Sequence, residues 1–207
     1  MPRYKLIEET ALRIDAELPL DPIDWKSLFG AEGRVEVEIG IGKGRFILAS
    51  AAERSDVHHF GIEWANRYLR VAETRAVRRG LENVRFARID VRDLMPAIPD
   101  ASVSAFYVFY PDPWPKKRHH KRRFLNSVMA TQLARTLTAG GGLHVATDHA
   151  GYWSVIEPLF DGHADFRRLT VFGGDEFPLP TDEPLTNFET KYRVQGRSRH
   201  RGSWQRS

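Results

Sequence analysis

The 207-residue sequence lacks cysteine altogether. This absence excludes disulfide bonds and thiolate metal sites, and it suits a reducing compartment. Long hydrophobic runs are also lacking, so no segment is long and apolar enough to span a bilayer. The first 20 residues carry acids and have no continuous apolar core, which is not the pattern of a secretory signal. We therefore expect a globular cytoplasmic protein.

Outside one short segment, the sequence has no marked excess of positive or negative charge. The sequence has 31 Lys and Arg against 27 Asp and Glu, a net charge of +4, and six of the cations stand in residues 116–123. Without those six, 25 basic residues remain against 27 acidic ones. A local basic cluster suits contact with a polyanion, although a solvated charged face is the alternative. We favour the polyanion because the cluster lies between a proline-aromatic loop and an apolar helix pattern, not in a tail.

From residue 34 onward, runs typical of strands alternate with runs of helical periodicity. The expected strands are 35–39, 57–62, 84–89, 103–109, 143–146, 166–172 and 192–195, and the expected helices are 43–54, 65–79, 123–137 and 152–160. Such alternation predicts a parallel sheet covered by helices on both faces, with ligands beyond the carboxyl ends of its strands. We expect residues 1–33 to form a partly flexible leader with one short helix, 34–196 the domain, and 197–207 a loose basic tail.

A glycine-rich loop follows the first expected strand, in the sequence Glu38-Ile-Gly40-Ile-Gly42-Lys-Gly. Its glycines allow a tight turn and close approach of a ligand. The dinucleotide fingerprint needs a third small residue where Arg45 stands, so a nicotinamide or flavin site is disfavoured. A carboxylate at Glu38 would repel a pyrophosphate and favour a cation. A tight structural turn with a surface acid is the competing interpretation.

Acids also follow the second and third expected strands. Glu63 lies about 20 residues beyond the glycine loop, the spacing at which a carboxylate accepts hydrogen bonds from both ribose hydroxyls. Asp90 could accept a hydrogen bond from an exocyclic amine, and Asp93 could serve instead. As alternatives, Glu63 could interact with a helix dipole, and either aspartate could cap the next turn.

The fourth expected strand runs into Tyr110-Pro-Asp112-Pro-Trp114-Pro. Proline fixes φ and restricts the residue before it, so Asp112 should be held in a rigid, extended loop. A carboxylate and an aromatic ring held in this way suit a flat heterocycle with N–H donors. The alternative is a structural turn with Trp114 as a core residue.

The motifs together resemble those of the bacterial tRNA (guanine-N7-)-methyltransferases. They are EIGIGKG at 38–44, GIE at 61–63, the acid Asp90, PDPWPKKRHHKRR at 111–123, ATD at 146–148 and TNFETKY at 186–192. They occur in family order and cover nearly all of residues 34–193. The long basic motif is specific, whereas the glycine loop alone is not. Tyr110, where phenylalanine is frequent, is a mild departure.

The resemblance implies a Rossmann-like class I methyltransferase fold, α/β, with a seven-stranded, mostly parallel sheet and an antiparallel last strand. It implies S-adenosylmethionine as cofactor and guanine 46 of the tRNA variable loop as substrate. Carried over to this sequence, the cofactor residues are Glu38, Gly40, Gly42, Glu63, Asp90 and Asp112, and Asp112 is also the catalytic residue. The substrate residues are Lys116, Asp148, Thr186, Asn187, Phe188 and Glu189. The RNA-contacting residues are Arg118, His119, His120, Lys121, Arg122 and Arg123.

Other functions remain open on the sequence alone. The target could be another RNA, DNA or a small molecule, although a small-molecule enzyme would not need the basic run. A non-catalytic tRNA-binding module is a second alternative, against which the four acids at strand ends argue. His119 and His120 stand among so many cations that we expect no metal there. The sequence leaves monomer and homodimer equally open.

Overall fold

The computed structural model describes residues 12–14, 21–173, 186, 189–190, 194–196 and 198–207. The chain divides into two compact units. Unit 1 comprises Met1–Ala97 and Pro180–Leu185, and unit 2 comprises Ile98–Leu179 and Thr186–Ser207. Among the described residues each unit contains four strands, one more in total than the seven expected.

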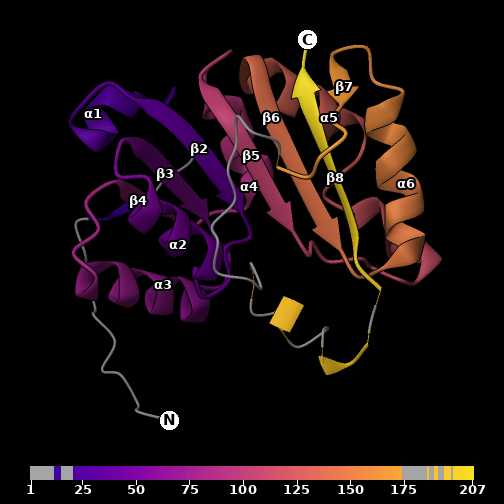
Figure 1. The fold of residues 1–207 in the computed structure, drawn as a ribbon, viewed down its shortest axis with the longest axis horizontal. Helices are drawn as coiled ribbons and strands as arrows, with labels where there is room; N and C mark the ends of the chain where they lie inside the picture. The colour runs from indigo at the N-terminus through magenta and orange to yellow at the C-terminus, as the bar shows by residue number, and fades with distance from the viewer. Residues whose placement is uncertain (1–11, 15–20, 174–185, 187–188, 191–193, 197) are drawn as a thin grey trace. The chain divides into compact units, whose positions relative to one another are not determined.

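The strands of unit 1 are all parallel (Figure 1). They follow the order β1 (Arg13–Ile14), β4 (Val84–Ala87), β3 (Val57–Ile62) and β2 (Arg34–Ile39). β2 and β3 confirm the predicted strands at 35–39 and 57–62. β4 is two residues shorter than predicted, and the two-residue β1 was not expected. Because the strands are parallel, their carboxyl ends lie at one edge, and the glycine loop, Glu63 and Asp90 follow them.

Helices cover both faces of these strands, as predicted. α2 (Arg45–Glu53) and α3 (Asn66–Arg78) share one face, where Ile47, Leu69 and Phe86 belong to one buried cluster. The short α1 (Trp25–Phe29) lies on the other face and confirms the short helix expected in the leader. There Trp25 packs edge-on against Phe60 of β3, with ring centroids 5.2 Å apart. α4 (Val91–Leu94) and the 3-10 helix η1 (Met95–Ala97) complete the unit.

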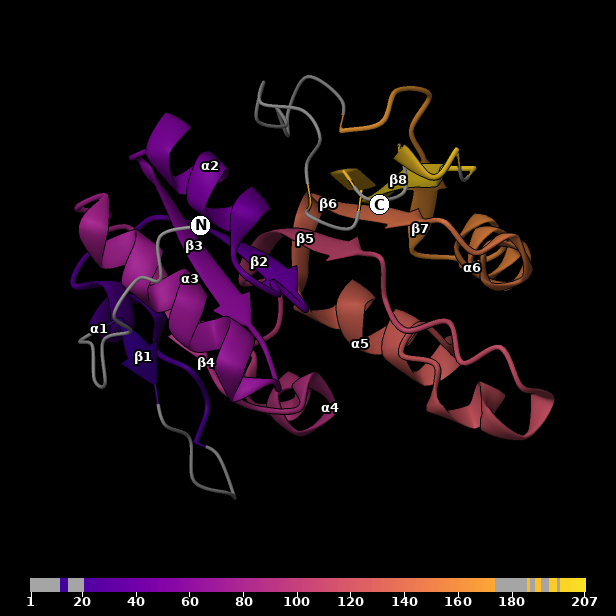
Figure 2. The same cartoon turned by 90° about the horizontal axis from the view of Figure 1, so that it is seen from below.

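The strands of unit 2 are mixed. β5 (Val103–Phe109) pairs in parallel with β6 (Leu137–Thr147), β8 (His200–Arg206) pairs antiparallel with β6, and β7 (Phe166–Arg168) pairs antiparallel with β8. Figure 2 shows α5 (Ser127–Thr136) on the lower side of β5 and β6. α6 (Ala150–Asp161) packs against β8 through Trp204, whose ring centroid lies 5.2 Å from that of Phe160.

Several predictions in unit 2 were wrong in extent. The helix expected at 123–137 begins at Ser127, because the Asn126 side chain accepts a hydrogen bond from the Met129 amide and caps it. The strand expected at 143–146 begins at Leu137 and runs through glycines that carry no strand signature. β7 ends at Arg168, not at residue 172.

The predictions for the last 16 residues were also wrong where the structure describes them. Val194 is helical, which contradicts the strand expected at 192–195, although residues 192–193 lie outside the described residues. The basic tail expected to be loose contains β8, which pairs with β6 from Gly142 to Thr147. β8 is thus the antiparallel final strand that the resemblance implied, at a later position than expected.

Candidate active site

The glycine loop of unit 1 is built on left-handed backbone. Gly40, Gly42 and Gly44 have φ angles of 78°, 54° and 73°, a region that disfavours residues with a side chain. A Cβ added at Gly44 would lie 2.8 Å from the Ala72 Cβ, so the loop packs tightly on α3. A Cβ added at Gly40 or Gly42 would meet no atom of the described residues within 4 Å. Within the described part of the chain, the loop is therefore packed against its own unit at Gly44 and uncrowded at the other two glycines.

Four backbone amides of this loop donate hydrogen bonds to acceptors within unit 1. The Gly40 and Ile41 amides donate to the Ile62 carbonyl, at 2.8 and 3.2 Å, and the Gly44 amide donates to the Ile41 carbonyl at 2.9 Å. The Gly42 amide donates to Glu63 Oε2 at 2.9 Å. A phosphate-binding loop needs such amides to face the ligand. The four amides named above donate within unit 1 instead.

Glu63 braces the loop against the end of β3. Its Oε1 accepts a hydrogen bond of 2.7 Å from the Ala65 amide, at the start of α3, while Oε2 holds Gly42. Each carboxylate oxygen has two lone pairs, so both retain capacity to accept a second donor. The contact with the start of α3 agrees with the alternative interpretation of Glu63, whereas the hydrogen bond to the Gly42 amide was not indicated by the sequence. Both contacts leave the carboxylate able to accept from a ribose.

Glu38 is buried, with 4% of its surface exposed. Its Oε2 accepts a 3.0 Å hydrogen bond from the Ile47 amide, in the first turn of α2, where Gly44 offers no side chain for capping. Burial raises the pKa of Glu38 to about 8, and the charge of Glu63 acts in the same direction, while the Ile47 amide opposes it. A cation placed beside Glu38 would favour its ionised form.

Asp90 caps α4, as its alternative interpretation proposed. Its Oδ1 accepts from the Arg92 amide and from Arg92 Nε, both at 2.9 Å. The pKa of Asp90 is lowered, chiefly by the hydrogen bond from the Arg92 side chain. Asp93 lies within α4. Trp64, which the sequence analysis did not single out, follows Glu63 directly and is 69% exposed.

The proline-aromatic loop of unit 2 is strained as well as rigid. Tyr110 and Trp114 have φ angles of 55° and 41°, which is costly for residues with large side chains. The Tyr110 amide donates to the Ala146 carbonyl at 2.7 Å, which fixes the start of the loop to β6. Asp112 is exposed. The loop therefore presents the Asp112 carboxylate to solvent from a backbone held at both sides.

Arg123 differs from the rest of the basic run, because it is buried. It is 6% exposed, its Nε donates to the Pro113 carbonyl at 2.9 Å, and its guanidinium lies 4.7 Å from the centre of the Tyr152 ring. The sequence predicts an RNA contact at this position. The structure instead shows a side chain that braces the proline loop against α6, so we leave Arg123 out of the RNA surface proposed below.

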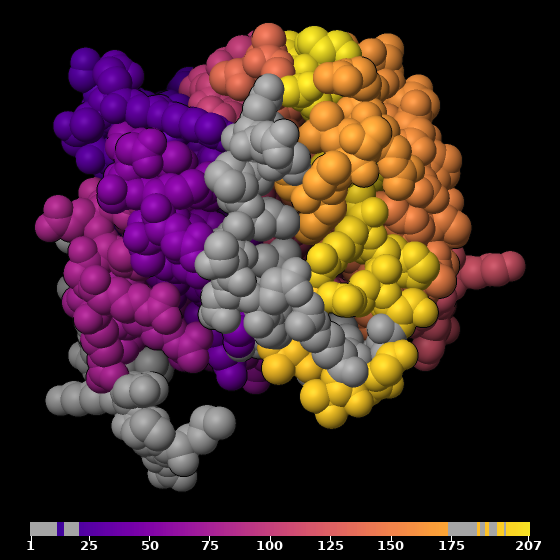
Figure 3. All heavy atoms as spheres, in the orientation of Figure 1, coloured from indigo at the N-terminus to yellow at the C-terminus, as the bar shows by residue number. Residues whose placement is uncertain are grey.

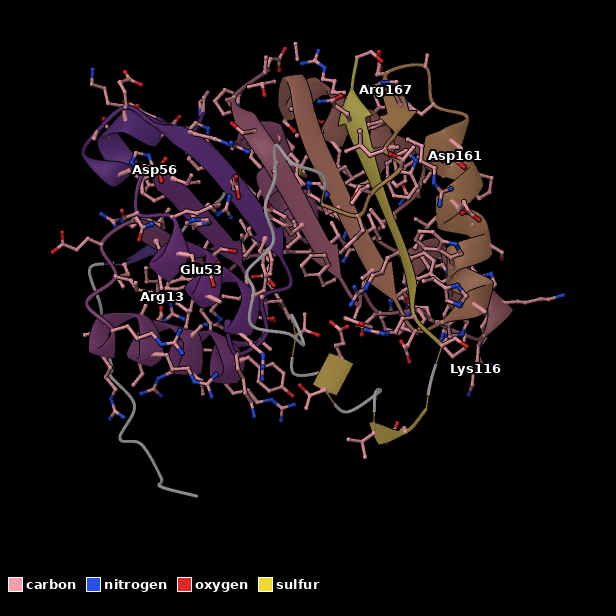
Figure 4. The ribbon with its side chains drawn as sticks, in the orientation of Figure 1. Arg13, Glu53, Asp56, Lys116, Asp161 and Arg167 are labelled. Atoms are coloured by element: carbon pink, nitrogen blue, oxygen red, sulfur yellow. The ribbon has the colours of Figure 1, made fainter. Side chains whose placement is uncertain are left out.

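The remaining basic residues lie on or beside the 3-10 helix η2 (Lys117–Arg122), which is separate from α5. Lys116 precedes η2 and points outward (Figure 4). All of residues 116–122 are exposed except His119, which is half-buried. Trp114 packs with this run, since the Arg122 guanidinium lies 4.9 Å from its ring centre and the His119 ring 5.9 Å. Trp114 is therefore a support for the basic segment and not a residue of the main core.

The charges of two predicted substrate residues, Asp148 and Glu189, act on Tyr110. Burial raises the pKa of Tyr110 to about 12, and the charges of Glu189 and Asp148 add to this effect, while Arg201 and Arg199 oppose it. Glu189 is 1% exposed and forms ion pairs with Arg199, at 2.7 Å, and with Arg201. Thr186 Oγ1 accepts a hydrogen bond from the Glu189 amide at 3.0 Å. Asn187 and Phe188 lie outside the described residues.

The described part of the chain contains no helix that could cross a membrane and no group of three or more potential metal ligands.

The 16S rRNA methyltransferase KamB superposes with a TM-score of 0.64, at 14% identity, over 91% of this chain and 95% of its own. The aminoglycoside-resistance methyltransferase NpmB1 gives 0.57 at 17% identity, over 84% and 87%. The fold is therefore that of the class I methyltransferases.

The family follows from sequence comparison. The methyltransferase family model Methyltransf_4 matches residues 32–201. A tRNA (guanine-N(7)-)-methyltransferase of Nocardia farcinica is 38% identical over 86% of this chain and 70% of its own length. One from Nitrosococcus oceani is 33% identical over 93% of this chain and 80% of its own. The chain belongs to the tRNA (guanine-N7)-methyltransferase family, as its motifs indicated.

Proposed function

We propose that this protein is a cytoplasmic enzyme that transfers a methyl group from S-adenosylmethionine to N7 of guanine 46 in the tRNA variable loop. The observation that carries the proposal is the 33–38% identity to enzymes named for this activity over 86–93% of the chain. Of the cofactor residues that the family motifs mark, Glu38 lies at the carboxyl end of β2, and Gly40, Gly42, Glu63, Asp90 and Asp112 follow strands, where ligands of such folds bind.

The residues of unit 1 suit S-adenosylmethionine. Gly40 and Gly42 are uncrowded among the described residues, and four loop amides donate within unit 1, which suits a ligand without phosphate. Glu38 would hold the cationic end, because a cation offsets the cost of ionising a buried carboxyl. Glu63 would accept from the ribose hydroxyls and Asp90 from adenine, and the exposed Trp64 ring offers adenine a surface to stack on.

The chemistry requires alignment more than proton transfer. S-adenosylmethionine supplies a methyl group bound to a sulfonium centre. Guanine N7 carries an in-plane lone pair and no proton, so its attack needs no general base. The enzyme must hold N7 in line with the methyl carbon. Asp112 would accept from the N–H groups of guanine and stabilise the positive charge that develops on the ring.

The base-side residues of unit 2 have distinct roles. We infer that Lys116, Asp148 and Thr186 contact the substrate nucleotide. Because Glu189 is buried between two arginines, its role is to position Arg199 and Arg201 rather than to contact the base. Arg118, His119, His120, Lys121 and Arg122 would contact RNA phosphates, in a manner independent of sequence and sensitive to salt.

The proposal is tested by mapping N7-methylguanine by mass spectrometry. A tRNA transcript is incubated with the protein and S-adenosylmethionine, beside a transcript in which guanine 46 is replaced by adenine. We expect one methyl group at position 46 of the first transcript and none on the second. Methylation of rRNA fragments instead, or no methylation of any RNA despite cofactor binding, would contradict the proposal.

The same assay tests the role of Asp112. The D112A variant should lose about 100-fold or more in single-turnover methyl transfer, the scale of removing one transition-state interaction from a preorganised site. Its tRNA affinity should change less than about threefold, since Asp112 contributes no phosphate contact. The D112N variant keeps the size of the side chain and removes its charge, so it should also be slow. Nearly intact turnover in both variants would refute the role.

A further inference from the structure

We infer a second RNA-binding surface, on α3 of unit 1, formed by Arg67, Arg75 and Arg78 and flanked by Arg70 and Arg79. It rests on the proposed function and adds to it, since the basic run at 116–122 belongs to unit 2. We call this surface the α3 arginine stripe. Nothing in the family motifs marks it, because none of them extends into residues 66–79.

The stripe follows from helical geometry. At 100° per residue, Arg67, Arg75 and Arg78 fall within about 80° of one another around α3. At 1.5 Å per residue, Arg67 and Arg78 are separated by about 16 Å along the axis, a length that covers several nucleotides. Arg67 and Arg78 are exposed, whereas Arg75 is half-buried and donates to the Lys43 carbonyl at 2.9 Å, so Arg67 and Arg78 carry the inference. The opposite side of α3 carries Leu69, Ala72 and Ala76, which are fully buried.

Within its own sequence, α3 contains four arginines and one acid. The one acid in the helix is Glu73, which is 2% exposed and pairs with Arg13 at 3.1 Å. An ordinary solvated helix mixes charges of both signs at three- and four-residue spacing, because like charges there repel. Here Arg75 stands three residues before Arg78 and four before Arg79. Figure 4 shows nitrogen-tipped side chains gathered along the outer side of α3, and Figure 3 shows that side at the surface.

The helix dipole explains only half of the pattern. Cations near a helix C-terminus are favoured, which accounts for Arg75, Arg78 and Arg79. The first turn should favour acids, yet α3 has none there and carries Arg67 instead. The Arg67 guanidinium is ordered by its neighbour, lying 4.5 Å from the Tyr68 ring centre and donating to the Tyr68 hydroxyl at 2.7 Å. An ordered guanidinium suits bidentate contact with phosphate.

The partner that fits is the phosphate backbone of the tRNA. The stripe is arginine throughout, without lysine, and a guanidinium group can bind a phosphate through two parallel hydrogen bonds, a geometry that the point charge of an ammonium group does not offer. A tRNA is much larger than the short 3-10 helix η2, so contacts from a second element extend the footprint over more phosphates. The stripe would supply affinity and orientation, and no sequence information, because phosphate contacts are the same for every base.

The test compares two double variants that each remove two exposed cations. R67Q/R78Q alters the stripe, and K26Q/R167Q alters α1 and β7, where Lys26 and Arg167 are exposed and assigned no role. We expect R67Q/R78Q to weaken tRNA binding about tenfold to a hundredfold at moderate salt. The slope of log K against log salt should fall in magnitude by about 2, one for each phosphate interaction that the substitutions remove. K26Q/R167Q should bind tRNA as the wild type does.

The outcomes separate this inference from the proposed function. Equal thermal melting and equal cofactor binding in both variants establish that the fold is intact. If the wild type methylates tRNA but R67Q/R78Q binds tRNA as K26Q/R167Q does, the stripe is not an RNA surface, and a protein partner becomes the better interpretation. If the wild type neither binds nor methylates tRNA, the proposed function itself fails and the inference falls with it.

Discussion

Glu38, for which we propose a cofactor contact, is a buried carboxyl near the end of β2. The sequence placed an acid at position 38, and the structure shows that this acid also holds the first turn of α2 through the Ile47 amide. The cap could not be predicted, because Glu38 lies outside the helix that it stabilises and Gly44 gives no capping signal. Asp90, whose side chain caps the turn that directly follows it, could be predicted from local sequence.

Glu38 should make the protein less stable as pH rises toward 8. Its pKa is about 8 when folded and about 4.5 when unfolded, so between these values the folded state binds more protons. The free energy of unfolding then decreases with pH, by roughly 1 kcal/mol per pH unit. The E38Q variant lacks this effect and should be more stable than the wild type at pH 8, by about 3 kcal/mol, with the difference shrinking toward pH 5.

The measurement is urea unfolding at several pH values between 6.5 and 8. Below 6.5 a second group acts in the opposite sense: burial lowers the pKa of His59 to about 3, so the unfolded state binds the extra proton and stability rises with pH. Restricting the range separates the two groups. A wild type and an E38Q variant with parallel stability profiles from pH 6.5 to 8 would show that Glu38 is ionised in the folded protein.

At the scale of elements, β8 is a strand that the sequence does not predict. Residues 200–206, HRGSWQR, contain one large apolar residue among charged and polar ones, so no alternating pattern marks a strand. The strand exists because β6 offers it a complete antiparallel partner and α6 offers Trp204 a packing surface. β2, β3 and β5 could be predicted, since their β-branched and aromatic runs are buried on both faces.

The W204A variant should therefore destabilise unit 2 by about 3–5 kcal/mol, the usual cost of removing a buried tryptophan. Trp204 is fully buried, and its indole donates to Asp161 Oδ1 at 2.7 Å. The matched control is V128A, an apolar truncation in the same unit at a side chain that is 71% exposed, which should cost less than about 0.5 kcal/mol. Urea unfolding followed by far-ultraviolet circular dichroism gives both values. Equal stability of the two variants would contradict the packing of Trp204 and would support the earlier prediction that residues 197–207 form a loose tail.

At the scale of the whole molecule, the proposed roles divide between the two units. The residues proposed for the cofactor, Asp112 excepted, belong to unit 1, and those proposed for the substrate base belong to unit 2. The sequence alone could predict that the acids of the cofactor motifs lie at the ends of strands. Arg123 could not, because only the folded loop shows that its guanidinium is turned inward to the Pro113 carbonyl.

Hydrogen exchange of the whole chain should separate these roles. S-adenosylhomocysteine should slow exchange chiefly in unit 1, at the Gly42, Ile47 and Ala65 amides that donate to Glu63 and Glu38. A ligand at 100 times its Kd stabilises the bound state by about 2.7 kcal/mol, so exchange through opening of that unit should slow up to about a hundredfold. Transfer RNA should slow exchange at residues 111–123 of unit 2 and, if the α3 arginine stripe binds it, in α3 of unit 1. Protection by tRNA that is confined to unit 2 would refute the stripe while leaving the methyltransferase activity in place, because the two ligands report on different residues.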